Sequence, residues 1–151
     1  MTLDSEVQSL RQVPMFRDID ASRLKLLAFT SERLHFSKGQ RFFAQGDAAD
    51  AAFVILDGRA DVVLDNPAGP VKVAELGRNA LVGEMGILAD APRSATVVAT
   101  EESSALRIDK RVFFELLTQF PQMSIAIMRE LAGRLERTNA QLVARIAPRS
   151  A

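Results

Sequence analysis

The alternation of apolar and polar positions changes character twice along the chain. The N-terminal part reads as two short helices, over residues 4–12 and 21–30, with Asp20 as a plausible N-cap of the second. From residue 33 to 108 the chain shows short apolar runs with a β-like texture, separated by glycines and other turn residues. From Asp109 onward the pattern is helical again. The chain is therefore expected to have helices at both ends and strands between them.

The middle part contains several short strands at regular spacing. The clearest ones cover residues 53–56, 60–64, 71–74, 94–99 and 104–108. Residues 33–36 also alternate like a strand, and residues 65–70 read as a hairpin loop. Such a series predicts a barrel or jelly roll. The expected fold class is therefore α+β, mainly β. It is a jelly-roll β-barrel over about residues 33–108, with short N-terminal helices over about 4–30 and C-terminal helices over about 110–146.

The last helix is long and carries an apolar stripe. Asp109 is expected to cap a first helix, and Pro121 to open a longer one that runs to about Ile146, before Ala147-Pro148. Its apolar positions fall on one face, and they are Met128, Leu131, Leu135, Leu142 and Ile146. Thr138 and Asn139 interrupt this stripe between Leu135 and Leu142. Two interpretations follow: the stripe packs on its own barrel, or it faces a partner and tolerates a polar pair at the seam. The second is favoured.

Composition excludes several classes of protein. The 151 residues suit one domain, 1–151, and 19 basic residues balance 19 acidic ones, which gives no reason for nonspecific binding to nucleic acid or to an anionic membrane. The absence of Cys excludes disulfides and thiolate metal sites. The single His35 is expected at the surface and leaves no multi-histidine metal site. No apolar run approaches the ~20 residues of a membrane span, and no signal peptide is apparent, so a cytoplasmic location is expected.

The most informative segment is Val-Gly-Glu-Met-Gly-Ile-Leu-Ala-Asp-Ala-Pro-Arg-Ser-Ala-Thr-Val, residues 82–97. Gly83 permits a close approach of backbone to ligand, and residues 84–88 are long enough for a helical turn whose free N–H groups suit an anion. Arg93 offers a bidentate grip on phosphate, whereas Glu84 is a good acceptor for a sugar hydroxyl. The combination fits a small phosphorylated sugar ring.

This string resembles the phosphate-binding cassette of the cyclic nucleotide-binding domain family. The residues that carry the resemblance are Gly83, Glu84, Met85, Gly86, Ile87, Leu88, Pro92, Arg93, Ser94 and Ala95. The resemblance implies that Glu84 binds the ribose 2′-hydroxyl and Arg93 the cyclic phosphate. Val82 stands where Phe is common and is expected to line one wall of the pocket. Gly39, Gly46-Asp47 and Gly58 also match the family, so the resemblance covers about residues 10–145.

Within the family the chain looks like the catabolite activator branch, in which the long helix pairs two subunits. That branch carries a Thr-Ser pair 17 and 18 residues after the helix-opening Pro, in contact with the purine; here the count from Pro121 gives Thr138 and Asn139. Arg134 lies one turn earlier and is expected to approach the base or the cassette. Ser94 permits cyclic GMP, but Arg-Ser-Ala commonly goes with cyclic AMP in bacterial relatives, so cyclic AMP is the expected ligand.

Three functions compete at this point. The first is a cyclic nucleotide receptor that signals to a protein partner through movement of its C-terminal helix, with a homodimer through that helix as a further expectation. The second is a regulatory fragment of a larger channel, kinase or transcription factor. The third, an enzyme acting on a cyclic nucleotide, needs a metal-bound water whose ligands are absent from the sequence. No helix-turn-helix region follows the long helix, so no direct DNA binding is expected. The expected ligand is the nucleotide, and no further cofactor is expected.

Overall fold

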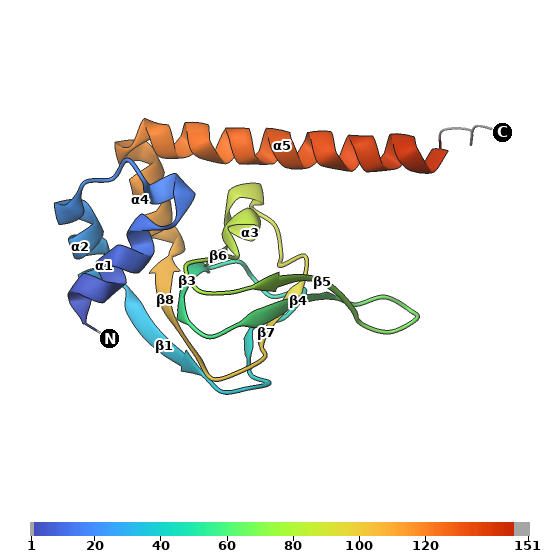
Figure 1. Cartoon of the computed structure of the whole chain (residues 1–151), viewed down its shortest axis with the longest axis horizontal. Coiled ribbons are helices and arrows are strands. Elements are labelled where there is room, and N and C mark those ends of the chain that lie inside the picture. Colours follow the sequence, from blue (N-terminus) through green and yellow to red (C-terminus); the bar gives the residue numbers. More distant parts are fainter. Residues whose placement is uncertain (1, 147–151) are drawn as a thin grey trace.

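The protein folds into N-terminal helices, a roll of two β-sheets and two C-terminal helices (Figure 1). The computed structural model describes residues 2–146. In chain order the elements are α1 (Leu3–Arg11), η1 (Pro14–Phe16), α2 (Ala21–Thr30), β1 (Glu32–Phe36), β2 (Arg41–Phe43), β3 (Ala51–Asp57), β4 (Ala60–Leu64), β5 (Val71–Leu76), β6 (Leu81–Val82), α3 (Glu84–Ala89), β7 (Thr96–Ala99), β8 (Ser103–Asp109), α4 (Lys110–Gln119) and α5 (Pro121–Ile146). The expected α+β, mainly β, fold class is confirmed.

The strands form two antiparallel sheets. One has the order β1-β8-β3-β6 and the other the order β2-β7-β4-β5. The sheets are separate hydrogen-bonded ladders, so the predicted barrel is an open roll rather than a closed one. α1, α2 and α4 cluster beside the first sheet, whereas β4 and β5 project away from them as a long hairpin (Figure 1).

Strand β3 explains why the sequence shows one unbroken apolar run there. Every residue from Ala51 to Leu56 is buried, because β3 is covered on both faces. Phe53 and Ile55 join the cluster inside the roll, and Val54 and Leu56 join the cluster shared with the helices. Successive strand residues point to opposite faces, so one short segment contributes to two cores.

Most element boundaries agree with the sequence pattern, and the cap predictions are confirmed. Asp20 accepts from the backbone N–H of Arg23, and Asp109 accepts from that of Arg111. One expectation is wrong: the strand predicted over residues 94–99 begins only at Thr96. Ser94 and Ala95 form a bend instead, because the backbone of the preceding Arg93 is hydrogen-bonded to the loop at Gly46 and Asp47 rather than to a strand. The expected stop at residues 147–148 lies outside the described residues.

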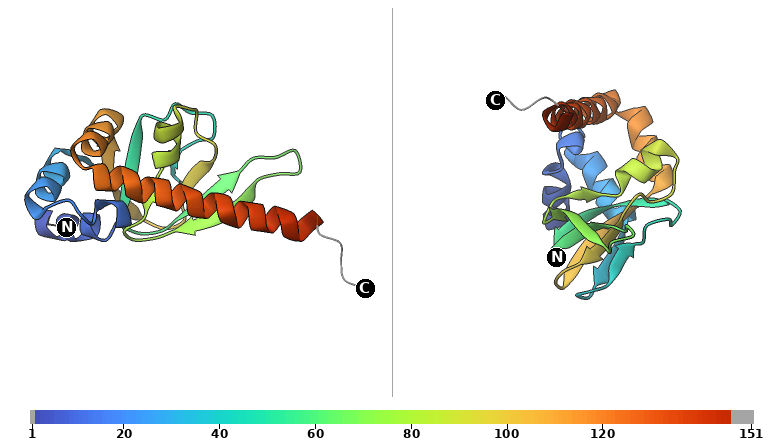
Figure 2. Two further views of the ribbon diagram at one scale, coloured as in Figure 1. Left: turned by 90° about the horizontal axis from the view of Figure 1, so that it is seen from above. Right: turned by 90° about the vertical axis from the view of Figure 1, so that its right-hand side faces the viewer.

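Helix α5 spans the length of the molecule, and its far half lacks cover (Figures 1 and 2). Met123 and Ile127 are buried at its start and Leu131 is partly buried. Beyond this point Leu135 and Ile146 are 62% and 79% exposed. Within the predicted stripe only Leu131 packs on the domain, because Met128 is already 60% exposed. Within residues 2–146, no helix combines the length and apolar character that crossing a membrane requires.

Gly58 lies where the neighbouring backbone of the roll leaves no space for a side chain. It has φ +102°, and a Cβ there would lie 2.5 Å from Ser103 Cβ and 2.7 Å from Ser103 Cα, whereas Gly39, with φ +88°, has open space around a Cβ. Gly39→Ala is expected to cost about 1–2 kcal/mol from the left-handed backbone alone. Gly58→Ala is expected to cost clearly more, since it adds a backbone clash. Urea unfolding of both variants measures this, and equal losses would contradict it.

Candidate ligand-binding site

Residues 83–95, hereafter the cassette, begin with a glycine that no other residue can replace without strain. Gly83 has φ +87° and is the N-cap of α3, with no side chain capping the helix. A Cβ at this position would lie 2.6 Å from Arg93 Nη1 and 2.9 Å from Phe43 Cε2. Gly83 thus allows the backbone to turn into α3 while the Arg93 side chain lies directly against it.

Glu84 is the first residue of α3 and is buried, with a side chain 9% exposed. Burial is the main influence on its carboxyl and raises its pKa, against the opposing effects of its own backbone N–H and of the Arg134 charge. A carboxylate has about four lone-pair sites, so its own backbone N–H and Arg134, 3.8 Å away, leave it capacity to accept further hydrogen bonds. It is therefore able to accept hydrogen bonds from hydroxyl groups of a ligand.

Arg93 is held in place through its backbone. Its N–H donates to the carbonyl of Asp47 at 2.8 Å, and its carbonyl accepts from the N–H of Gly46 at 2.8 Å. The Asp47 carboxylate in turn accepts from the backbone N–H of Ala44 at 2.9 Å, which fixes the loop. The Gly-Asp pair noted in the sequence therefore positions Arg93 across more than forty intervening residues.

The guanidinium of Arg93 is buried, with a side chain 2% exposed. Nη1 donates to the carbonyl of Gly83 and Nη2 to that of Ala51, each at 2.5 Å. Nε is buried and has no hydrogen-bond partner. A buried donor without an acceptor is costly, so this edge of the guanidinium is suited to an incoming oxygen atom.

Little negative charge balances Arg93. Its nearest carboxylate oxygen is Asp50 Oδ1, 4.0 Å from Nη2, and Asp50 also pairs with Arg107 at 3.3 Å. Asp50 is 72% exposed, so its charge is screened by solvent. Burial accordingly lowers the pKa of Arg93, although Asp50 and Asp47 oppose this effect. The result is a fixed, under-compensated positive charge, which favours an anion.

Helix α5 contacts Glu84 of the cassette through the side chain of Arg134. Arg134 Nη2 lies 3.8 Å from Glu84 Oε1 and 2.7 Å from Glu130 Oε1. A cavity of about 290 Å³ adjoins this contact; it is lined by Val13, Pro14, Met15, Asn79, Ala80, Leu81, Glu84, Ala126 and Glu130. The helix is therefore joined to Glu84 by an ion pair and is not tightly packed around it.

The other expected site residues divide into two groups. Val82 is buried in the inner core, Met85 and Ala95 are partly buried, and Ser94 is exposed next to Arg93. Thr138 and Asn139 are exposed on α5. In the part of the chain that the structure describes, no hydrogen bond or ion pair joins these two residues to the cassette. The structure thus brings Gly83, Glu84, Arg93 and Arg134 together, but not Thr138 and Asn139.

Sequence reasoning missed the surroundings of Arg93. Phe43 ends β2, Ala51 begins β3 and Arg107 lies in β8, while Asp50 directly precedes β3. Only the fold brings these residues together. The spacing of Gly46-Asp47 was the one sequence signal near this region. His35, expected at the surface, pairs with Glu102 at 2.6 Å on the exposed side of β1.

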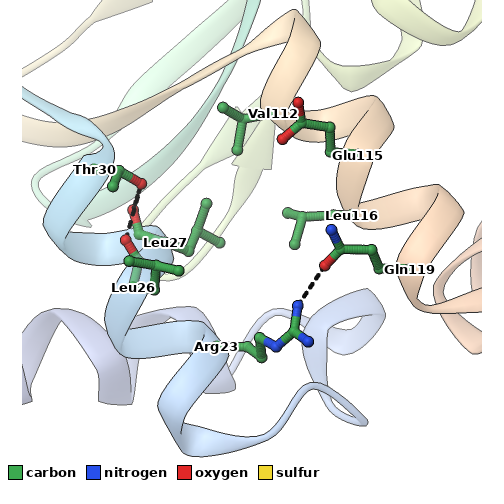
Figure 3. A pocket seen from close by; sticks show the side chains of 8 residues that line it. All are labelled: Arg23, Leu26, Leu27, Thr30, Val112, Glu115, Leu116 and Gln119. Carbon is green, nitrogen blue, oxygen red and sulfur yellow. Dashed lines mark hydrogen bonds between the residues drawn. The ribbon is translucent and has the colours of Figure 1, made fainter.

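A second hollow, between α2 and α4, has a different character (Figure 3). This groove of about 290 Å³ has an apolar floor of Leu27, Val112 and Leu116, and at one end Arg23 Nη1 donates to Gln119 Oε1 at 2.5 Å. None of the site residues expected from the sequence lines it. Within residues 2–146, no group of three or more His, Cys, Asp or Glu side chains is arranged to hold a metal ion.

Comparison with known proteins gives a consistent result. The sequence model of the cyclic nucleotide-binding domain matches residues 33–120. An uncharacterised NTE family protein of Mycobacterium bovis is 34% identical over 137 residues, which is 91% of this chain and 23% of that protein. The cAMP-dependent protein kinase regulatory subunit of Mucor circinelloides is 32% identical over 108 residues, 72% of this chain and 25% of the relative. This chain thus spans about a quarter of these relatives.

Among solved structures, the catabolite activator protein of Thermus thermophilus superposes with a TM-score of 0.77 at 26% identity, over 85% of this chain and 61% of that one. The similarity extends through most of the helices as well as the roll.

The raised pKa of Glu84 predicts a pH-dependent stability. The folded chain holds the Glu84 proton more tightly than the unfolded chain, so stability falls as pH rises from the ordinary Glu pKa through the raised value, and is level above it. The Glu84→Gln variant has no carboxyl group at this position, so its stability does not fall with pH in this way. Its melting temperature, relative to the wild type, is expected to be higher near neutral pH and to converge with it in acid.

Thermal unfolding across this pH range measures the difference. Glu136→Gln, at an exposed position of α5, is the matched control and should show no such trend. A wild-type chain that lost stability relative to Glu84→Gln on acidification would contradict the assigned burial effect.

Proposed function

Because the chain belongs to the cyclic nucleotide-binding domain family, we propose that it is a receptor for a purine cyclic nucleotide, with cyclic AMP preferred over cyclic GMP. The observation that carries the proposal is the buried, under-compensated Arg93 a few residues from a buried Glu84. The cyclic phosphate provides the anion for Arg93, and the ribose 2′-hydroxyl provides the donor for Glu84. One ligand thus satisfies both groups from a single segment.

The preference for cyclic AMP rests on Arg93-Ser94-Ala95 and on the likeness to a cAMP-dependent kinase regulatory subunit. Ser94 is exposed beside Arg93, so its hydroxyl is accessible to either nucleotide. In this proposal the base extends from the roll toward α5, where Arg134, Thr138 and Asn139 are the candidates for contact.

Signal transmission through α5 is the second part of the proposal. A ligand shifts a helix only if its contacts differ between the two helix positions. A ribose hydroxyl bound to Glu84 competes with Arg134 for the same carboxylate, and Arg134 retains Glu130 at 2.7 Å. The cavity beside this contact leaves space for α5 to move. Binding would thereby loosen the link between the cassette and the helix.

A regulatory module of this kind acts on other proteins or on other domains of a longer chain. The two relatives are about three and four times as long as this chain, which supports a regulatory domain within a larger cytoplasmic protein as readily as a stand-alone receptor. An enzymatic function for this domain is not proposed, since the matched family model describes a binding domain.

The first test is isothermal titration calorimetry with cyclic AMP and cyclic GMP. Cyclic AMP is expected to bind at micromolar concentration or below. Arg93→Ala is expected to cost ~3–5 kcal/mol of binding, because it removes the partner of a buried charge. Glu84→Ala is expected to cost ~1–3 kcal/mol, since it meets neutral hydroxyls. Arg93→Lys should recover only part of the loss, because Lys lacks the planar fork.

Circular dichroism of each variant controls for folding, which matters because Arg93 also holds two backbone carbonyls. No saturation by either nucleotide at millimolar concentration would refute the proposed function. A milder effect for Arg93→Ala than for Glu84→Ala would reverse the assigned roles.

The exposed end of the α5 stripe predicts a homodimer, at least with nucleotide bound. Leu135 and Leu142 are 62% and 50% exposed, and burying such side chains against a second copy is favourable. Leu135→Glu with Leu142→Glu should abolish association and weaken nucleotide binding. Phe29→Glu, equally apolar and 77% exposed but on α2, is the control and should do neither. Light scattering that shows a wild-type monomer at saturating nucleotide would contradict this.

A further inference from the structure

The ring of Phe43 lies against the guanidinium of Arg93, and no part of the proposed function uses it. We propose that Phe43 is a positioning residue: its ring face holds the guanidinium plane in the orientation in which the ligand phosphate meets it. This inference rests on the proposed function of Arg93 and adds a residue outside the cassette. It concerns the affinity for the anionic part of the ligand.

The stacking geometry is well defined. Arg93 Cζ lies 4.0 Å from the centroid of the Phe43 ring, a face-on contact. The ring is itself held in place, because it packs against Phe53, with centroids 6.1 Å apart, and against the backbone of Gly83. Phe43 ends strand β2, which belongs to the same sheet as β7, directly after the cassette. These contacts hold the ring beside Arg93.

The ring and the ligand use different sides of Arg93. Guanidinium N–H groups point outward in the plane of the group, and phosphate oxygens approach along that plane. Two of these directions are occupied by the carbonyls of Gly83 and Ala51, and Nε is left without a partner. Phe43 contacts Arg93 through its ring face, under Cζ, and offers no hydrogen-bond acceptor, so it does not compete for the free edge. Instead it prevents the plane from rotating away.

Charge gives a reason for an aromatic side chain here. A carboxylate in contact with Arg93 would neutralise it and would have to be displaced by the phosphate. An aromatic face stabilises a cation without neutralising it. The nearest carboxylate oxygen, on Asp50, is 4.0 Å away and shared with Arg107. Phe43 therefore lowers the free energy of the buried cation while leaving its charge available to the ligand.

The test compares variants that keep or remove the ring face. Phe43→Tyr keeps it, and Phe43→Leu keeps the apolar volume but removes it. Phe43→Leu is expected to weaken cyclic AMP binding about three- to thirtyfold, the range from an exposed to a desolvated cation–π contact. Phe43→Tyr should restore affinity close to that of the wild type. Phe43→Leu should have no further effect in an Arg93→Lys background if the ring acts only through a planar guanidinium.

A measurement on the ligand-free chain tests the contact between Phe43 and Arg93 independently of nucleotide binding. In the NMR spectrum of the wild type the Arg93 Nε–H resonance should carry a ring-current shift that Phe43→Leu abolishes and Phe43→Tyr retains. Failure of the wild-type chain to bind either nucleotide would overturn the proposed function and this inference with it. Two outcomes would overturn this inference alone, provided that the wild type binds. One is that Phe43→Leu binds cyclic AMP as tightly as the wild type or more tightly. The other is that Phe43→Leu reduces affinity by the same factor in the Arg93→Lys background as in the wild type.

Discussion

The buried guanidinium of Arg93 is the interaction on which the rest of the site depends. It joins the carbonyl that opens the cassette, on Gly83, to the carbonyl that opens β3, on Ala51. These two points are separated by more than thirty residues, and the hydrogen bonds make the cassette part of the roll rather than a surface loop. The position of Glu84 follows, because α3 starts directly after Gly83.

This arrangement has an electrostatic cost that a ligand can relieve. Burial lowers the pKa of Arg93 and raises that of Glu84, so each charge is disfavoured where it stands, and each is paired with other groups. An ion pair formed directly between them would remove the cost but would also fill the site. Keeping them apart leaves a cation and an acceptor that are already oriented, so little reorganisation is needed on binding.

The sequence predicts the fold and the cassette better than it predicts the surroundings of the cassette. Helix caps at Asp20 and Asp109 and the start of α5 at Pro121 are local signals, and local physics determines them. The sequence predicts one strand over residues 94–99, whereas Ser94 lies in a bend, because a hydrogen bond from Arg93 to Asp47 that the sequence does not reveal sets the boundary of β7. Phe43 and Asp50 were missed for the same reason: their roles come from tertiary contacts.

The ion pair between Glu84 and Arg134 of α5 is weak, and this weakness lets the helix respond to a ligand. Arg134 is nearly half exposed and has two carboxylates in reach, Glu130 on its own helix at 2.7 Å and Glu84 across the gap at 3.8 Å. The longer contact, partly screened by solvent, contributes little to stability, so it costs little to give up. Because Glu130 remains as a partner, Arg134 is not left unpaired when Glu84 turns to another donor. A helix held in this way can respond to a small ligand, whereas a helix packed tightly against the cassette would require far more differential binding energy to move.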